Sequence, residues 1–358
     1  MKKALKIIAL VSVTAIIGGL VGCSSPASPS PAATTSATVS AEPSASPSDT
    51  SNANASPSAG ALDTKPLPVQ GSPVKVTFIC ADMANESQAY SSRCFTKYAP
   101  NYGLQCDVLD AKGDAQTETQ CVQNAVAQGS KAIYVNPNDI HAIVPALAAA
   151  HKAGVLVGMF SSDLAAGDQA NRDFFCGVND TEAGKDAADA FIKQFPNGAN
   201  IVEVGGQAGH DAQIKRHDGF NNEIKGTNIK VIDYKACQQW DTSQAQTIME
   251  DMITKEGPKI QGVFCHWDNG ATGCINALKA ANMTGLFLVA IDGCKAGFDQ
   301  VNAGDQSVCI MQNFDNMTMK ELQCTQAALY KQPFNAINFI PLDIITKDNI
   351  SQYPMPQW

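Results

Sequence analysis

Polar and aromatic side chains that could bind a small molecule follow many of the apolar runs in this chain. These runs are expected to be strands of parallel sheets, and in open sheets of that kind ligands bind beyond the carboxyl ends of the strands. The residues concerned are Asp82, Asn85, Asn136, Asp139, Ser161, Ser162, His210, Arg216, Trp240, Asp241, Trp267, Asp268 and Asp292. Amides, carboxylates and guanidinium groups can each hydrogen-bond two neighbouring atoms, and an indole covers an apolar face. This set indicates binding of a small polar molecule.

The same residues do not form a catalytic constellation. A dinucleotide enzyme requires Gly-x-Gly-x-x-Gly between a strand and a helix, and the segment 205–209 has the position without the spacing. A nucleophile elbow of the form Gly-x-Ser-x-Gly does not occur in the sequence. We therefore expect no enzyme activity, no catalytic residue and no cofactor.

The elements that must position these residues alternate between short apolar strands and helices. Strands too apolar to have a solvent face, separated by helices, are typical of parallel sheets covered on both sides. The alternation occurs in two similar sets, the second beginning near Asn179. The fold class is therefore predicted to be α/β, with two similar doubly wound parallel-sheet lobes joined by a hinge of about three crossings. The strands are expected at 74–79, 105–109, 132–135, 154–159, 201–204, 229–232, 263–264 and 287–291.

The N-terminus is predicted to be a targeting segment rather than part of the fold. Residues 1–22 combine three lysines with a short apolar run, which is typical of a secretory signal. The run resembles a bacterial lipobox at Leu20-Val21-Gly22-Cys23, and this implies cleavage before Cys23 and lipidation of its thiol. Residues 23–72 are rich in Ser, Pro, Ala and Thr and are predicted to be a disordered tether. An uncleaved anchor helix is the alternative for the first segment.

The charge balance and the cysteine spacing argue against nucleic acid, an anionic membrane surface and a metal ion as binding partners. The chain has 25 Lys and Arg against 34 Asp and Glu, which argues against nucleic acid and against an anionic membrane surface. Of its 12 cysteines, Cys265 and Cys274 lie near His266, but their spacing matches no standard zinc motif. We expect no metal site, and the pairing of the remaining cysteines is not predicted.

Four short motifs in order resemble the ribose-binding protein family, which has the type I periplasmic binding protein fold. The residues after Tyr134 resemble Ile-Asn-Pro-x-Asp, and 216–220 match Arg-x-x-Gly-Phe. Ala290-Ile291-Asp292-Gly293 matches the Asp-Gly at the end of a strand, and Gln312 lies where that family has a ligand-binding glutamine. The resemblance extends from about Val74 to Thr346.

This resemblance implies a solute-binding protein of an ABC importer that closes over a small polar ligand, preferentially a monosaccharide or sugar-like molecule. The N-terminal lobe (N-lobe) would comprise 73–178 and 313–342, and the C-terminal lobe (C-lobe) 179–312 and 343–358. The expected partners are the ligand, a permease and an ATPase, with membrane contact through the lipid anchor only and the protein as a monomer. The ligand-binding residues would be Asn85, Asn136, Ser161, Arg216, Trp240, Trp267, Asp268, Asp292 and Gln312.

The sequence departs from the sugar-binding pattern of this family in the N-lobe wall. Ser87 and Gln88 replace a Phe pair, and Ser161 and Ser162 replace an Asp-Arg pair. A non-sugar metabolite, such as a nucleoside or an amino acid, therefore remains an alternative ligand. A receptor that signals to a histidine kinase or chemoreceptor is an alternative function.

Individual site residues also have simpler interpretations. Asp292 could cap the turn after its strand, and Arg216 could be a surface cation on a helix. Trp240 and Trp267 could be ordinary core residues.

Overall fold

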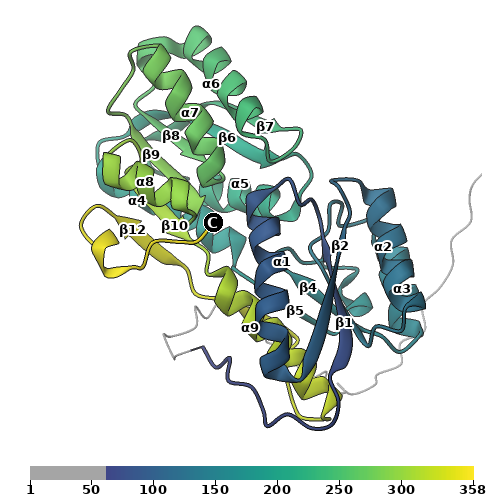
Figure 1. The fold of residues 1–358 in the computed structure, drawn as a ribbon. Coiled ribbons are helices and arrows are strands. Elements are labelled where there is room, and N and C mark those ends of the chain that lie inside the picture. Colours follow the sequence, from purple (N-terminus) through teal and green to yellow (C-terminus); the bar gives the residue numbers. More distant parts are fainter. Residues whose placement is uncertain (1–61) are drawn as a thin grey trace, which may run out of the picture. The chain divides into compact units, whose positions relative to one another are not determined.

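The computed structural model describes residues 62–358, which form two lobes of α/β architecture (Figure 1). The predicted signal segment, Cys23 and the tether up to residue 61 lie outside the described residues. The N-lobe sheet has the order β11-β5-β4-β3-β1-β2, and the C-lobe sheet has the order β12-β10-β9-β8-β6-β7. The two orders follow the same pattern, which confirms the predicted pair of similar lobes.

The first lobe is built around a parallel sheet with helices on both faces. Its core joins the sheet to α1 and α9 on one face and to α2 and α3 on the other. Phe78, Phe95, Tyr134 and Phe160 form an aromatic cluster, with Phe95 stacked on Phe78 at 4.4 Å and on Tyr134 at 4.9 Å. The elements are β1 Val74–Cys80, α1 Glu86–Tyr98, β2 Leu104–Asp110, α2 Ala115–Ala127, β3 Ala132–Val135, α3 Val144–Lys152, β4 Leu156–Phe160, β5 Phe174–Gly177, α9 Phe314–Leu329 and β11 Ile337–Phe339.

The second lobe repeats this plan, and β12 alone is antiparallel to its neighbour β10 among its described strands. Helices α4 and α5 cover one face of the sheet, and α6 and α7 cover the other. The elements are α4 Asp180–Gln194, β6 Ala199–Gln207, α5 Asp211–Glu223, β7 Ile229–Cys237, α6 Thr242–Glu256, β8 Gly262–Cys265, α7 Asp268–Ala280, β9 Phe287–Asp292, α8 Lys295–Ala303, β10 Val308–Met311, β12 Asp343–Thr346 and η4 Ile350–Gln352.

The chain crosses between the two sheets at three connections. These connect β5 to α4, β10 to α9, and β11 to β12. These connections lie near residues 178, 312 and 342. The sequence prediction missed the short strands β5, β10, β11 and β12, because runs of three or four apolar residues carry little periodic signal.

The segment 62–70 lies along α9, although the sequence assigns it to the disordered tether. The side chain of Gln326 accepts a hydrogen bond from the backbone N–H of Leu67 at 2.7 Å and donates one to its carbonyl oxygen at 2.9 Å. The backbone N–H of Gln70 donates to the Tyr330 hydroxyl at 2.8 Å. The part of the chain that packs against the N-lobe therefore includes residues from Leu62 onward, ahead of the predicted start at residue 73. Within the described range, no helix is long and apolar enough to cross a membrane.

Candidate ligand-binding cleft

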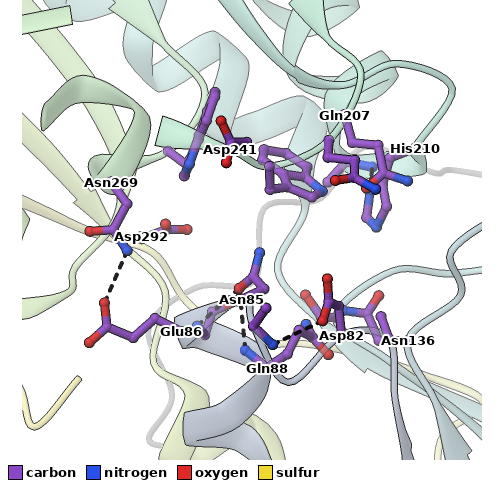
Figure 2. A pocket seen from close by; sticks show the side chains of 18 of the residues that line it. Asp82, Asn85, Glu86, Gln88, Asn136, Gln207, His210, Asp241, Asn269 and Asp292 are labelled. Atoms are coloured by element: carbon purple, nitrogen blue, oxygen red, sulfur yellow. Dashed lines mark hydrogen bonds between the residues drawn. The ribbon is translucent and has the colours of Figure 1, made fainter. Parts of the chain in front are cut away.

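A cavity of about 480 Å³ lies between the lobes, at the carboxyl ends of the strands of both sheets. Figure 2 shows Asp82, Asn85, Gln88 and Asn136 on one side and Gln207, His210 and Asp241 on the other. The volume lies within the range of small-molecule pockets. Of the residues predicted to bind the ligand, those that line it are Asn85, Asn136, Ser161, Arg216, Trp240, Trp267, Asp292 and Gln312.

The two lobes meet across the mouth of this cavity. The Asn269 side-chain amide at the start of α7 donates to the Glu86 carboxylate at the start of α1, at 3.1 Å (Figure 2). The Gln207 side-chain amide at the end of β6 donates to the carbonyl oxygen of Asn138 at 3.5 Å. A ligand in the cavity is therefore partly enclosed by both lobes.

The N-lobe supplies amide groups from the start of α1 and the end of β3. Asn85 is the N-cap of α1, and its Oδ1 accepts from the backbone N–H groups of Ser87 and Gln88. This leaves the Nδ2 of Asn85 to donate into the cavity. Asn136 is buried, and its Oδ1 has no hydrogen-bond partner within the protein.

Asp292 and Gln312 lie together at the ends of β9 and β10. The Gln312 side-chain amide donates to Oδ1 of Asp292 at 2.9 Å, while its own Oε1 is buried and unpartnered. The φ angle of Asp292 is +143°, a backbone conformation that non-glycine residues rarely adopt. Such strain is maintained only where surrounding contacts fix it, and it often marks a functional site.

Asp268 is the predicted binding residue that does not line the cavity. It is fully buried, and its Oδ2 accepts from the backbone N–H groups of Gly293 at 2.8 Å and Cys294 at 3.2 Å. Its Oδ1 accepts from the side chain of Gln306 at 2.9 Å. The prediction of direct ligand contact is therefore replaced by a positioning role, because Asp268 holds the turn directly after Asp292.

Arg216 on α5 is held by partners on two sides. Its Nε donates to Oδ1 of Asp180 at 2.8 Å, and its Nη1 donates to the carbonyl oxygen of His266 at 2.5 Å. Its guanidinium carbon lies 5.7 Å from the centre of the Trp240 ring. The side chain is only 4% exposed, so the interpretation as a surface cation is wrong.

The C-lobe also presents an aromatic wall. Trp240 and Trp267 are perpendicular, with ring centres 5.4 Å apart, and His210 packs edge-on against Trp240 at 5.4 Å. The Nδ1 of His210 accepts from the backbone N–H of Ala212, so its Nε2 carries the hydrogen. Burial, followed by the charges of Arg216 and Lys215, lowers the pKa of His210 to about 3, which keeps this ring neutral.

The charge in the cavity is mainly acidic, and one carboxyl is strongly perturbed. Burial, with a further contribution from Asp268, raises the pKa of Asp292 to about 8. Among the described residues, the lone cationic side chain lining the cavity is Arg216. The carboxylic side chains that line the cavity are Asp82, Glu86, Asp241 and Asp292.

Several lining residues are absent from the ligand-binding set that the family resemblance implies, although His210 and Asp241 belong to the wider set of residues that follow apolar runs. Gln88, His210 and Asp241 each follow a strand or begin a helix, which is a signal that the sequence does contain. Phe314 begins α9 and has the same signal, whereas Trp358 has none, because it reaches the cavity from the last described residues.

The possible zinc ligands Cys265, His266 and Cys274 have other surroundings. Both cysteines lie in the apolar core of the C-lobe, whereas Nε2 of His266 is 2.9 Å from Oε1 of Glu203. In residues 62–358, no group of three or more His, Cys, Asp and Glu side chains could hold a metal ion.

Comparison with known proteins places this architecture among binding proteins. A model of the family described as periplasmic binding protein domain matches residues 76–330. The ribose import binding protein of Escherichia coli is 26% identical over 251 residues, covering 70% of this chain and 83% of that protein. The xylitol-binding protein of Mycolicibacterium smegmatis is 28% identical over 254 residues, covering 71% and 72% respectively.

Solved structures share the fold. The crystal structure of a galactofuranose binding protein has a TM-score of 0.74 and 22% identity, covering 78% of this chain and 97% of that chain.

Proposed function

The chain belongs to the periplasmic binding protein domain family, and we propose that it is an extracytoplasmic solute-binding lipoprotein of an ABC importer that binds a neutral sugar or polyol. The relatives carry the names of import and binding proteins, so the chain is a binding protein and not an enzyme. The resemblance to ribose-binding proteins is thereby confirmed.

The observation that carries the ligand class is a set of three amide side chains that line one cavity and that each have a buried oxygen without a protein partner. They belong to Gln88, Asn136 and Gln312. An unsatisfied buried acceptor costs about 1–3 kcal/mol, so a ligand that donates hydrogen bonds to all three gains their full value. A polyhydroxylated molecule carries several such donors at close spacing.

The charges favour a neutral ligand over an anionic one. The guanidinium of Arg216 is already bonded to Asp180 and to the His266 carbonyl, and no other cationic side chain of residues 62–358 lines the cavity. A phosphate or carboxylate group would face the carboxyl groups of the cavity without a free counter-charge. The Nε2–H of His210 and the Nδ2 of Asn85 complete the set with neutral donors.

Binding is proposed to proceed by hinge closure. The ligand first bonds to one lobe, and rotation about the three connections brings the other lobe over it. The contact between Asn269 and Glu86 then forms at the mouth, and a permease recognises the closed form.

A thermal-shift screen with sugars, polyols, nucleosides and amino acids tests the ligand class. A bound ligand raises the melting temperature by mass action. We expect a sugar or polyol to give the largest shift and the variants Asn136→Ala and Gln312→Ala to lose it. Asn338→Ala is the matched control, because this amide is also buried with an unpartnered Oδ1 but lies outside the cavity. Stabilisation by a nucleoside or an amino acid alone would refute the sugar assignment.

The lipid anchor at Cys23 is proposed from the sequence motif and has its own test. We expect Cys23→Ser to move the protein from the membrane fraction to the soluble fraction of the producing cell. Cys106→Ser, at a half-buried cysteine of the N-lobe, serves as the control. Equal membrane retention of Cys23→Ser and the wild type would exclude anchoring through this thiol.

A further inference from the structure

The last described residues form a strap that returns from the C-lobe to the N-lobe. Residues 353–358 follow η4 without further helix or strand, and the chain end marked in Figure 1 lies beside β10 and α1. The Trp358 ring stacks on Tyr90 of α1 at 5.7 Å and meets Phe314 edge-on at 5.0 Å. Its carbonyl oxygen accepts from the backbone N–H of Lys295 at 2.5 Å. One residue thus contacts both lobes.

Trp358 also lines the ligand cavity, and so do Trp240 and Trp267. These are all three tryptophans of the chain. Trp240 and Trp267 lie in the C-lobe, so Trp358 places an indole on the side of the cavity formed by the N-lobe. The start of α1, at Ser87 and Gln88, presents only polar side chains to that side.

We propose that Trp358 is a ligand-contacting wall of the cavity, supplied by the strap 353–358, and that it adds an indole to the N-lobe side beside Phe314 of α9. Stacked on Tyr90 and edge-on to Phe314, the indole is fixed by packing and presents an apolar surface beside the polar groups of Asn85 and Gln88. Such a surface covers the C–H face of a polyhydroxylated ring, while the surrounding amides bind its hydroxyls. This proposal rests on the proposed function, and it adds a ligand-contacting residue that does not lie at the end of a strand.

Because Trp358 contacts both lobes, closure of the hinge should also change its surroundings. Trp358 is fixed to the C-lobe by the Lys295 hydrogen bond and to the N-lobe by Tyr90, so rotation of the lobes moves the indole relative to one of them. We therefore expect its environment to change when the ligand binds.

The test compares Trp358→Ala and Trp358→Phe with the wild type by isothermal titration calorimetry. The titrant is whichever of D-ribose, D-xylose, xylitol, myo-inositol, uridine and L-leucine gives the wild type its largest thermal shift. We expect Trp358→Ala to raise the Kd about tenfold or more and Trp358→Phe to raise it less, since loss of an aromatic contact has effects of this size. Met355→Ala is the control, because Met355 lies in the same strap, is 41% exposed and does not line the cavity.

A second measurement reports whether the surroundings of Trp358 change on ligand binding, in protein that keeps this indole. Protein labelled with 5-fluorotryptophan gives three ¹⁹F resonances, and the one missing from Trp358→Phe belongs to Trp358. We expect that resonance to shift on titration, even if Trp358→Ala proves too unstable to assay. An unchanged Kd in Trp358→Ala, or a Trp358 resonance that does not respond, would overturn this proposal alone. If the wild type bound none of the compounds, the proposed function would fall and this proposal with it.

Discussion

Arg216 and Asp180 form a buried ion pair that supports the cavity, and its removal should affect stability and binding in separable ways. The Nε–Oδ1 distance is 2.8 Å, and the two side chains are 4% and 3% exposed. Breaking a pair of this kind by removing one partner costs about 3–5 kcal/mol, because a buried charge is left uncompensated. We expect Arg216→Met to lower the free energy of unfolding of the ligand-free protein by that amount.

The complementary variant should be milder, and the double variant should recover stability. In Asp180→Asn, Arg216 keeps its bond to the His266 carbonyl and has Asp292 nearby, so a loss of about 2–3 kcal/mol is expected. The double variant carries neither buried charge. Its loss should be smaller than the sum of the single losses by about 2 kcal/mol or more.

Ligand affinity should depend on whether Arg216 is present and not on the free energy of unfolding of the variant. Asp180→Asn retains the guanidinium that lines the cavity, so it should bind the ligand with reduced affinity, whereas Arg216→Met and the double variant should not bind. Urea unfolding followed by circular dichroism gives the free energies, and calorimetric titration gives the Kd values.

The exposed pair Lys279–Asp305 is the control. Its Nζ–Oδ2 distance is 2.6 Å and its side chains are 50% and 29% exposed, so removing either partner should cost no more than about 1 kcal/mol. The reasoning fails if Arg216→Met is as stable as the wild type, or if the double variant binds ligand.

Three further predictions follow from burial and close packing. A ligand hydroxyl that donates to Asp292 favours the ionised carboxylate, and the pKa of Asp292 in the free protein is about 8. Ligand affinity should therefore rise by up to about tenfold per pH unit from pH 6 to 8 and then level off, whereas Asp292→Asn should bind independently of pH. A flat pH profile of the wild-type affinity in calorimetry would contradict this. Glu321 is fully buried with both carboxyl oxygens unpartnered, and burial raises its pKa well above the unfolded value near 4.5, so the folded protein loses stability as pH rises above that value. Glu321→Gln should therefore be more stable than the wild type, with a larger gain at pH 7 than at pH 5, as measured by urea unfolding, and an equal gain at both pH values would refute the assignment. A Cβ at Gly206 would overlap the Trp240 ring, so Gly206→Ala should displace the indole and weaken binding at least about tenfold, with Gly167→Ala, where a Cβ meets nothing within 4 Å, as the comparison.

The sequence predicted the positions of the long strands and most of the cavity, and the physical reason is local. A run such as 132–135 is apolar on both faces, so it must lie in a covered parallel sheet, and its carboxyl end must lie at the ligand edge. Asn136 and Asp292 could be placed at the cavity by this reasoning alone. Their hydrogen bonds could not, because these depend on neighbouring strands.

Two residues show where local reasoning ends. Asp268 follows β8 just as Asp292 ends β9, yet it turns away from the cavity and accepts hydrogen bonds from the turn beyond Asp292. Spacing along the chain cannot distinguish these two orientations. Trp358 reaches the cavity through a strap without regular structure, and no pattern in its own segment indicates the contact with Tyr90.

The hydrogen bonds between segment 62–70 and α9 have a mechanical consequence. Because the Gln326 side chain hydrogen-bonds both backbone groups of Leu67, a force on the chain ahead of Leu62 acts first on the N-lobe and not on the C-lobe. In a protein held at its N-terminus, tension would therefore enter through the N-lobe, and it would reach the C-lobe through the three connections between the sheets.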